Sequence, residues 1–475
     1  MIRQLKASLA THAARNAFCI NDRYYTYQDL METTLRIQSA IAAKGGSQTK
    51  RIGIVTTNTI ETYASILACW FAGCAYVPLH PQNPEERTRT IIKEAQIDLV
   101  LDQQSSLQTD PVDDALRMEE LKDEDWLYIL FTSGSTGTPK GVPITYGNVK
   151  AFIDSFQALG FNYDESDRFL QMFDLTFDVS VASYLVPLLA GACVYTVPTE
   201  GIKYMQVLKI MKNYQVSFAS IVPSIINYLK PYFKEIHLPS LKYCVLTAEA
   251  SNIEVVQEWA GCMPNGRLIN LYGPTEATIW CTGFFFDPDA PKAYNGMLII
   301  GKPFKNVGML ILDDDGAETA RGAKGELCVS GGQVTPGYIN NEERNKSSFF
   351  IRDGRRYYRT GDLCYQDEDN DIFYCGRADH QVKIQGFRIE LSEIEVTARQ
   401  IFSLNTAAVA FKNNLGVQQI GLFLEKYSGE TQQVRSDLEK KLPYYMIPSA
   451  IRTIENLPYN TSGKIDRVSL AKLLE

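Results

Sequence analysis

The sequence has 475 residues, of which 45% are hydrophobic and 21% charged, and a formal net charge of -8. That length is too great for one small core and predicts two or more domains. The acidic balance excludes a generally basic surface for nucleic acid or an anionic membrane, so a bound polyanion would need local groups.

The cysteine and histidine content argues against a zinc site. Ten cysteines are scattered without a C-x-x-C pair, and only four histidines are present. A disulfide framework is also unusual at this length, so we expect reduced, mostly buried thiols in a cytoplasmic protein. Residues 1–20 lack the uninterrupted apolar run of a signal peptide. The apolar stretch 64–77 is too short to span a bilayer and predicts a buried helix leading into a strand.

Short apolar runs alternate with helical patterns in the first part of the chain. Buried strands are predicted at 51–56, 74–78 and 97–101, with helices at 62–72 and 84–95. This alternation indicates a parallel sheet covered on both faces, and its repetition over 185–245 predicts a second such sheet. The polar segment 102–125 is expected to be a solvated connection.

The pattern changes after residue 281. Short strands at 308–313, 325–330 and 371–375 predict a mostly antiparallel, barrel-like part. Residues from 380 onward show strand and helix patterns of their own, which suits a small α+β domain.

The most informative segment follows an apolar run at 128–132. Small, hydroxylated and glycine residues there let backbone N–H groups approach a phosphate, and a lysine adds positive charge. The residues concerned are Thr132, Ser133, Gly134, Ser135, Thr136, Gly137 and Lys140. The segment is not a Walker loop, because Pro139 stands where the second glycine should be. A flexible surface loop is the alternative for such a composition.

This string resembles the phosphate-loop signature of the adenylate-forming superfamily, which contains acyl-CoA synthetases, luciferase and the adenylation domains of nonribosomal peptide synthetases. Further motifs of that family follow in its order, at 270–276, 325–332, 336–338, 358–363, 376–390 and 460–467. The chain is most similar in character to amino-acid adenylation domains and D-alanine:carrier-protein ligases. The resemblance implies a large domain over 1–378, with two parallel-type sheet layers and a distorted β-barrel. It also implies a small mobile α+β domain over 379–475.

The resemblance implies that ATP and Mg²⁺ are used, and it assigns nucleotide-binding roles. Glu276 would hold the metal and Thr275 would donate to the α-phosphate. At the nucleoside, Tyr272 would stack on adenine and Asn270 would bind its edge. Asp362 would accept from both ribose hydroxyls, with Tyr374 and Arg377 nearby.

The resemblance places two further functions in the C-terminal domain. Lys464 would reach the carboxylate and the α-phosphate and stabilise charge that develops during adenylation. Asp379 matches the hinge between the domains. Gly386 would line the tunnel through which a thiol enters after the domain rotates.

Asp178 matches the acid that pairs with the α-ammonium group in amino-acid-activating members. The alternative is a helix N-cap, because an aspartate before an apolar helix is common. The other expected substrate-pocket residues are Val179, Ala182, Ser220, Leu246, Ala248, Leu271, Ile279 and Trp280. They are all uncharged, which predicts a small or medium neutral amino acid. An aromatic side chain stays an alternative, and chirality is not predicted.

The sequence ends at Glu475, soon after the motif that contains Lys464, so the acceptor thiol is expected on a separate phosphopantetheinylated carrier protein. The alternative acceptor is coenzyme A, which would make the chain an acyl- or aryl-CoA ligase. A catalytically silent nucleotide-binding protein is a third hypothesis. The joint presence of four functional residues argues against it: Lys140, Glu276, Asp362 and Lys464. Nucleic acid and membranes are not expected partners.

Overall fold

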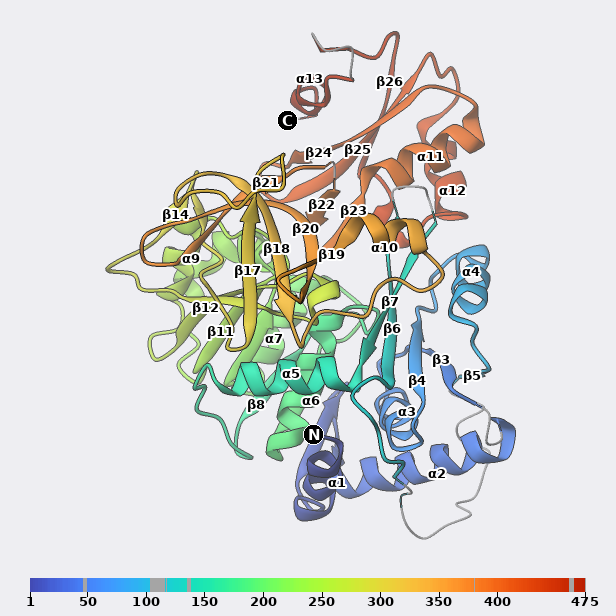
Figure 1. The fold of residues 1–475 in the computed structure, drawn as a ribbon, viewed down its shortest axis with the longest axis vertical. Helices are drawn as coiled ribbons and strands as arrows, with labels where there is room; N and C mark the ends of the chain where they lie inside the picture. Colours follow the sequence, from blue (N-terminus) through green and yellow to red (C-terminus); the bar gives the residue numbers. More distant parts are fainter. Residues whose placement is uncertain are drawn as a thin grey trace.

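Two largely parallel sheets form the N-terminal part of the molecule (Figure 1). The structure is a computed structural model that describes residues 1–45, 49–102, 116, 118–134, 138–379, 381–460 and 465–474. One sheet is built, in spatial order, from β5 (Leu99–Leu101), β3 (Arg51–Val55), β4 (Ala75–Leu79), β6 (Trp126–Thr132) and β7 (Lys140–Thr145). Only β7 is antiparallel to its neighbour. Helix α3 (Ile60–Phe71) packs on β3 and β4 and is buried all round except at Glu61, which explains its continuous apolar sequence.

The second sheet has a parallel centre and antiparallel edges. Its strands in order are β16 (Lys302–Pro303), β13 (Thr282–Phe285), β12 (Arg267–Tyr272), β11 (Tyr243–Thr247), β10 (Phe218–Ile221), β8 (Arg168–Gln171), β9 (Cys193–Thr196), β1 (Asn16–Ile20) and β2 (Arg23–Thr26). Fully buried strands such as β10 and β11 have the continuous apolar character expected of a sheet covered on both faces. The predicted pair of parallel-type layers is confirmed.

The helices of this part are mostly amphipathic covers for the two sheets. They are α1 (Ile2–Thr11), α2 (Tyr27–Gly45), α4 (Glu85–Ala95), α5 (Tyr146–Gln157), α6 (Asp178–Ala190), α7 (Lys203–Asn213), α8 (Pro223–Leu229), α9 (Ile253–Ala260) and α10 (Glu342–Ser348). Helix α6 packs on β8 and β9, and its C-terminus is closed by Gly191 in the left-handed region.

The predicted barrel-like part is a five-stranded antiparallel sheet. It consists of β17 (Val307–Leu312), β18 (Gly325–Gly331), β20 (Arg355–Gln366) and β19 (Phe349–Arg352), with β21 (Ile372–Arg377) beside β20. A small hairpin of β14 (Ala293–Tyr294) and β15 (Met297–Leu298) lies near β21.

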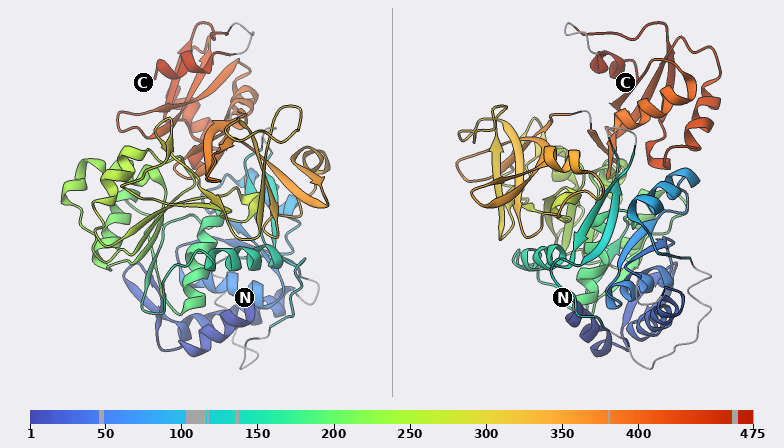
Figure 2. Two further views of the ribbon diagram at one scale, coloured as in Figure 1. Left: turned by 60° about the vertical axis from the view of Figure 1, so that its left-hand side comes forward. Right: turned by 45° about the vertical axis from the view of Figure 1, so that its right-hand side comes forward.

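Residues from Gln381 onward build their own sheets and cores at one end of the molecule, as both views of Figure 2 show. The strands are β22 (Gln381–Ile384), β23 (Phe387–Glu390), β24 (Thr406–Lys412), β25 (Gln418–Glu425) and β26 (Ala450–Ile454). The helices are α11 (Leu391–Phe402), α12 (Thr431–Glu439) and α13 (Arg467–Lys472). The hairpin β22–β23 reaches back toward the two large sheets.

The predicted burial of the cysteines is confirmed. All ten are free thiols and nine of them are buried. Within the described part of the chain, no helix combines the length and the apolar character that crossing a membrane requires.

Candidate nucleotide and acid site

The predicted phosphate loop connects the two strands of an antiparallel hairpin. Thr132 at the end of β6 pairs with Lys140 at the start of β7, so the loop returns directly to its own sheet. Ser135, Thr136 and Gly137 lie outside the described residues. Gly134 is required sterically, because a Cβ there would stand 1.9 Å from the carbonyl oxygen of Thr138. The Thr132 hydroxyl is buried and has no partner within the described residues.

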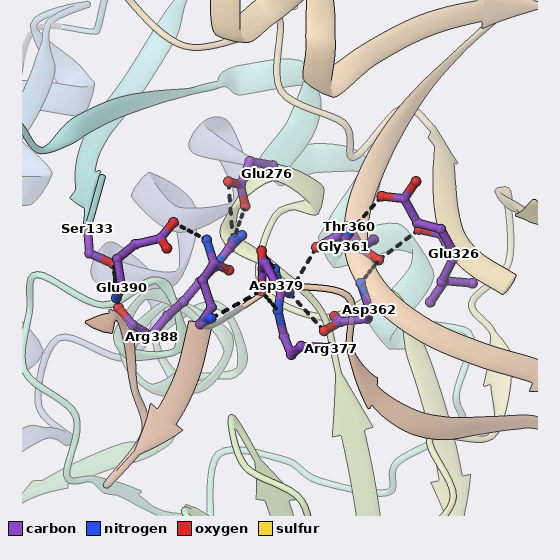
Figure 3. Close-up of polar contacts among 12 residues, drawn as sticks. Ser133, Glu276, Glu326, Thr360, Gly361, Asp362, Arg377, Asp379, Arg388 and Glu390 are labelled. Atoms are coloured by element: carbon purple, nitrogen blue, oxygen red, sulfur yellow. Dashed lines mark hydrogen bonds and ion pairs between the residues drawn. The ribbon is translucent and has the colours of Figure 1, made fainter. Parts of the chain in front are cut away.

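Glu276 is a fully buried carboxylate in the short 3-10 turn η3 (Thr275–Ala277) after β12. It accepts a hydrogen bond from the Tyr338 hydroxyl at 2.7 Å, and Arg388 Nη1 lies 2.9 and 3.2 Å from its two oxygens (Figure 3). Burial by itself raises a carboxyl pKa, but the cations of Arg388 and Lys140 outweigh it and lower the pKa of Glu276 to about 2. An ionised carboxylate beside the phosphate loop fits a magnesium ligand.

Lys140 is the buried cation of this end of the site. Burial, followed by the neighbouring Arg388, lowers its pKa to about 8. Its ammonium lies 3.9 Å from Glu390 Oε1 and 5.4 Å from the centre of the Tyr338 ring. It therefore keeps a positive charge available beside Glu276 at neutral pH.

The predicted nucleoside residues converge on one cavity of about 860 Å³, whose lining includes Asn270, Tyr272, Tyr374 and Arg377. Asn270 donates to the Ile299 carbonyl at 2.8 Å, which fixes its amide.

Asp362, on β20, connects the nucleoside residues to one another. One of its oxygens accepts from the Tyr272 hydroxyl. The other accepts from Arg377 Nη1 at 2.8 Å, as Figure 3 shows. This buried carboxylate is thus held in place from both sides.

Arg377 joins the nucleoside end to the predicted hinge. Besides contacting Asp362, it donates from Nε and Nη2 to the two oxygens of Asp379, at 2.7 and 2.6 Å. Such a two-pronged contact fixes direction as well as distance. In this arrangement the hinge residue is therefore tied to the carboxylate expected to bind ribose.

Asp178 is the first residue of α6, and the N-cap position belongs to Phe177, so the N-cap alternative for Asp178 is wrong. Its Oδ2 atom is buried and receives no hydrogen bond within the described part of the chain. Burial raises its pKa to about 7, against the opposing effects of the Thr275 hydroxyl and of the backbone N–H groups of Val179 and Ile279, which lie near the carboxyl group. A buried carboxylate with an orphan oxygen is costly unless a cationic or hydrogen-donating ligand meets it.

The other predicted substrate-pocket residues come from five neighbouring elements and are apolar or small. Val179 and Ala182 lie on α6, Ser220 on β10, Leu246 on β11, Leu271 on β12, Ala248 just after β11, and Ile279 and Trp280 after η3. All except Ala248 are buried, and Ala248 and Leu271 also line the large cavity.

The turn that carries Trp280 is strained. Ile279, a β-branched residue, has a φ of 73° in the left-handed region, which is rare for its type. Gln333 stabilises this turn by donating from Nε2 to the carbonyl of Trp280 at 2.8 Å. The Trp280 indole donates to the Thr247 hydroxyl at 2.7 Å, so the ring has a fixed position.

Gly386 is at the tip of the β22–β23 hairpin and faces the end of β11. Its φ is +86°, and a Cβ there would lie 2.8 Å from Val222 Cγ1. Its N–H donates to Glu249 Oε1 at 3.0 Å, while Glu249 Oε2 accepts from Ser224 N at 2.8 Å. Glu249 and Ser224 line the large cavity, so the hairpin closes one wall of it.

The comparisons with known proteins agree with this geometry. The model of the family described as AMP-binding enzyme matches residues 5–339. The chain belongs to the AMP-binding enzyme family. It is an adenylate-forming ligase, as its motifs predicted.

Curated relatives of this AMP-binding enzyme include tyrocidine synthase 2 of Brevibacillus parabrevis, which is 30% identical over 99% of this chain. The match spans only 13% of that longer protein. Tyrocidine synthase 1 of the same organism is 29% identical, with 96% of this chain and 43% of the relative covered.

Among solved structures, the Vibrio cholerae adenylation domain AlmE in complex with glycyl-adenosine-5'-phosphate has a TM-score of 0.88 at 26% identity. The match covers 99% of this chain and 97% of AlmE. The predicted fold class is thereby confirmed.

Lys464 of this AMP-binding enzyme lies outside the described residues, as do the other residues of 461–464. Ile465, which follows, packs with the β24–β25 sheet, and α13 lies at the outer end of the molecule in Figure 1. The role expected of Lys464 stays a prediction.

Several charged residues of the site were not singled out from the sequence. Lys383 and Arg388 lie within the 376–390 motif, and the Lys383 ammonium lies 5.0 Å from the centre of the Tyr272 ring. Glu249, Glu393 and Arg87 carried no recognisable signal, because their partners are far away in the chain. Only the tertiary contacts show that these residues belong to the site.

Proposed function

We propose that this enzyme activates a small neutral amino acid as an aminoacyl-adenylate and transfers the aminoacyl group to the phosphopantetheine thiol of a separate carrier protein. The observation that carries the amino-acid assignment is the buried Oδ2 of Asp178, which no described group satisfies. An α-ammonium group would satisfy it, whereas a fatty or aryl acid would leave it unpaired.

The proposed reaction has two steps. In the first, a carboxylate oxygen of the amino acid attacks the α-phosphorus of ATP, and pyrophosphate leaves. In the second, a thiolate attacks the acyl carbon, and AMP leaves. Both steps bring anions together, so positioning and fixed positive charge supply most of the catalysis.

The phosphate end of the site has the groups for the first step. Glu276 would hold Mg²⁺, which when bound neutralises phosphate charge. Lys140 would contribute a second cation, and the Thr132 hydroxyl, which has no partner among the described residues, could donate to a phosphate oxygen. Lys464 would add the cation that contacts the reacting carboxylate, once the C-terminal part has turned.

The pocket composition supports a small side chain. Its expected lining is uncharged, and the fixed Trp280 takes up volume that a large side chain would need. The structure of AlmE, which is 26% identical, contains a glycyl-adenylate, and glycine has no side chain.

The charges near the cavity support a carrier protein over coenzyme A, whose nucleotide carries several phosphates. Lys230 pairs with Glu258 at 2.9 Å, and Glu254 lines the same cavity. Arg377 of the same lining pairs with Asp362 and Asp379. Within the described lining this leaves Lys383 and Lys412 as the lysines without an ion pair, and Lys383 is held beside the Tyr272 ring, which is little positive charge for such phosphates. An acyl- or aryl-CoA ligase is therefore the less supported alternative.

We also propose that residues 1–378 and 379–475 are two domains that alternate about Asp379. The present contact of Gly386 with Val222 suits the thiol-transfer step. Adenylation would require a rotation that brings Lys464 to the site. The reduced thiols support a cytoplasmic location.

ATP–pyrophosphate exchange across a panel of amino acids and aryl acids tests this function. We expect exchange with a small neutral amino acid and none with aryl acids. Asp178→Asn should abolish it, while the exposed Asp164→Asn should not. Exchange with aryl acids alone, or undiminished exchange in Asp178→Asn, would reject the amino-acid assignment. Parallel loading assays with a phosphopantetheinylated carrier and with coenzyme A decide the acceptor.

A further inference from the structure

Glu393 of α11 inserts its carboxylate between an arginine and the phosphate loop. Its Oε1 accepts from Arg87 Nη1 at 2.8 Å, and its Oε2 accepts from the backbone N–H of Gly134 at 3.2 Å. The side chains of Glu393 and Arg87 are only 1% and 7% exposed. A carboxylate of the C-terminal part thus accepts hydrogen bonds from a guanidinium group and from a phosphate-loop amide of the N-terminal part.

That pair of donors is one that phosphates use. Guanidinium groups bind phosphate oxygens with strong charge-assisted hydrogen bonds, and backbone N–H groups of glycine-rich loops cradle them. Arg87 also lines a cavity of about 60 Å³ with Thr132, Ser133 and Thr275, so it faces the same space as the predicted phosphate ligands. Glu393 therefore occupies the position of an anion at this end of the site.

Neighbouring contacts follow the same pattern. The Ser133 hydroxyl donates to the Arg388 carbonyl at 2.8 Å and accepts from Glu390 N at 3.2 Å. The Glu390 carboxylate lies 3.9 Å from the Lys140 ammonium, and the Arg388 guanidinium forms an ion pair with Glu276. Acids of the C-terminal part face the cations and amides expected to bind phosphate, and its arginine covers the carboxylate expected to bind the metal.

Arg87 depends on the C-terminal part for its partners. Its ion pair is with Glu393, and within the described residues no second carboxylate pairs with it. The Tyr445 hydroxyl, its other close neighbour, also belongs to the C-terminal part. A rotation of the C-terminal part would remove Glu393 and Tyr445 from Arg87. The Arg87 guanidinium would then lie beside the phosphate loop without an anionic partner, which is costly unless another anion binds it.

We infer that Arg87 is a further ligand of the terminal phosphates of ATP and of pyrophosphate, and that the Glu393 carboxylate takes the place of one of those phosphates when the C-terminal part docks. The inference rests on the proposed function. It makes pyrophosphate binding and the docked arrangement mutually exclusive, so pyrophosphate must leave before docking, and docking opposes its return.

Calorimetric binding of AMP, ATP and magnesium pyrophosphate to the full-length protein tests the inference without any turnover. For Arg87→Ala we expect ATP and pyrophosphate to bind about tenfold more weakly or worse, and AMP, which has no β- or γ-phosphate, to bind as before. Arg87→Lys keeps the positive charge, so its affinity for ATP and pyrophosphate should lie between those of the wild type and of Arg87→Ala. Arg89→Ala is the matched control, because Arg89 lies on the same helix, is exposed and, among the described residues, forms its ion pair with Glu85 one turn away.

Glu393→Gln tests the second half of the inference. Weakening the contact of Glu393 with Arg87 should increase the fraction of molecules whose C-terminal part is not docked. Pyrophosphate should therefore bind at least about threefold more tightly. Glu439→Gln, on the exposed face of α12, should leave binding unchanged.

Equal weakening of AMP, ATP and pyrophosphate in Arg87→Ala would show a structural role and overturn the inference. Unchanged pyrophosphate binding in Arg87→Ala, or unchanged or weaker binding in Glu393→Gln, would overturn it as well. Wild-type protein that binds no adenine nucleotide would contradict the proposed function itself. The two failures are therefore distinguishable.

Discussion

Replacing Gly386 with alanine should separate the two half-reactions. The residue has a φ of +86°, and an added Cβ would approach Val222 Cγ1 to 2.8 Å. The left-handed conformation costs an L-residue about 1–2 kcal/mol, and relieving the overlap adds about 1 kcal/mol. The first penalty belongs to the hairpin turn itself, whereas the overlap with Val222 acts on the docked arrangement. About 1 kcal/mol corresponds to a thiol-transfer rate lowered about fivefold.

The assay compares single-turnover transfer from pre-formed aminoacyl-adenylate with ATP–pyrophosphate exchange. Transfer should fall in Gly386→Ala while exchange stays near wild type, because adenylation would use the other arrangement. Adding Val222→Ala removes the methyl group that the new Cβ meets and should restore part of the transfer rate. Gly354→Ala is the control, since Gly354 also has a positive φ but no atom lies within 4 Å of the position that its Cβ would take.

Three results would refute this reasoning. The first is unchanged transfer in Gly386→Ala, and the second is an equal loss of both half-reactions. The third is a failure of Val222→Ala to restore any transfer, which would show that the contact between the hairpin and Val222 does not limit the step.

Three further predictions concern charge and hinge motion. Lys464→Ala should lower adenylation about 10²- to 10³-fold, yet leave transfer from pre-made adenylate nearly intact; equal losses in the two assays would contradict its role. Because the pKa of Asp178 in the free protein is raised to about 7, it is increasingly protonated below that pH and less able to pair with an ammonium group. The kcat/KM for the amino acid should therefore fall about tenfold per pH unit below pH 7 and level off above it. A profile that is flat between roughly pH 5.5 and 8.5 would argue against this pairing. Asp379→Pro, which fixes φ at the hinge, should hold one arrangement and impair one half-reaction selectively, and unchanged rates in both would count against a hinge there.

The family and the chemistry could be predicted from the sequence because they reside in local strings. The glycine- and hydroxyl-rich loop before Lys140 and the motif around Glu276 each bring several functional groups within a few residues. Strands and helices of the first sheet were also predicted, because the apolar runs are short and bounded by turn residues. The structure shortens β5 to Leu99–Leu101 and begins α4 at Glu85, within the usual uncertainty of element ends.

The tertiary structure decided which charges meet. Arg87 and Glu393 are 306 positions apart, and neither lies in a pattern that indicates its partner. Asp178 follows Phe177 in a sequence that suits an N-cap. The packing around α6 shows that its carboxylate is buried and that Oδ2 has no hydrogen-bond partner among the described residues. Local sequence sets conformational preference, whereas burial and long-range contacts depend on how whole elements pack. The roles of the predicted site residues therefore stay predictions, while the fold that gathers them is established.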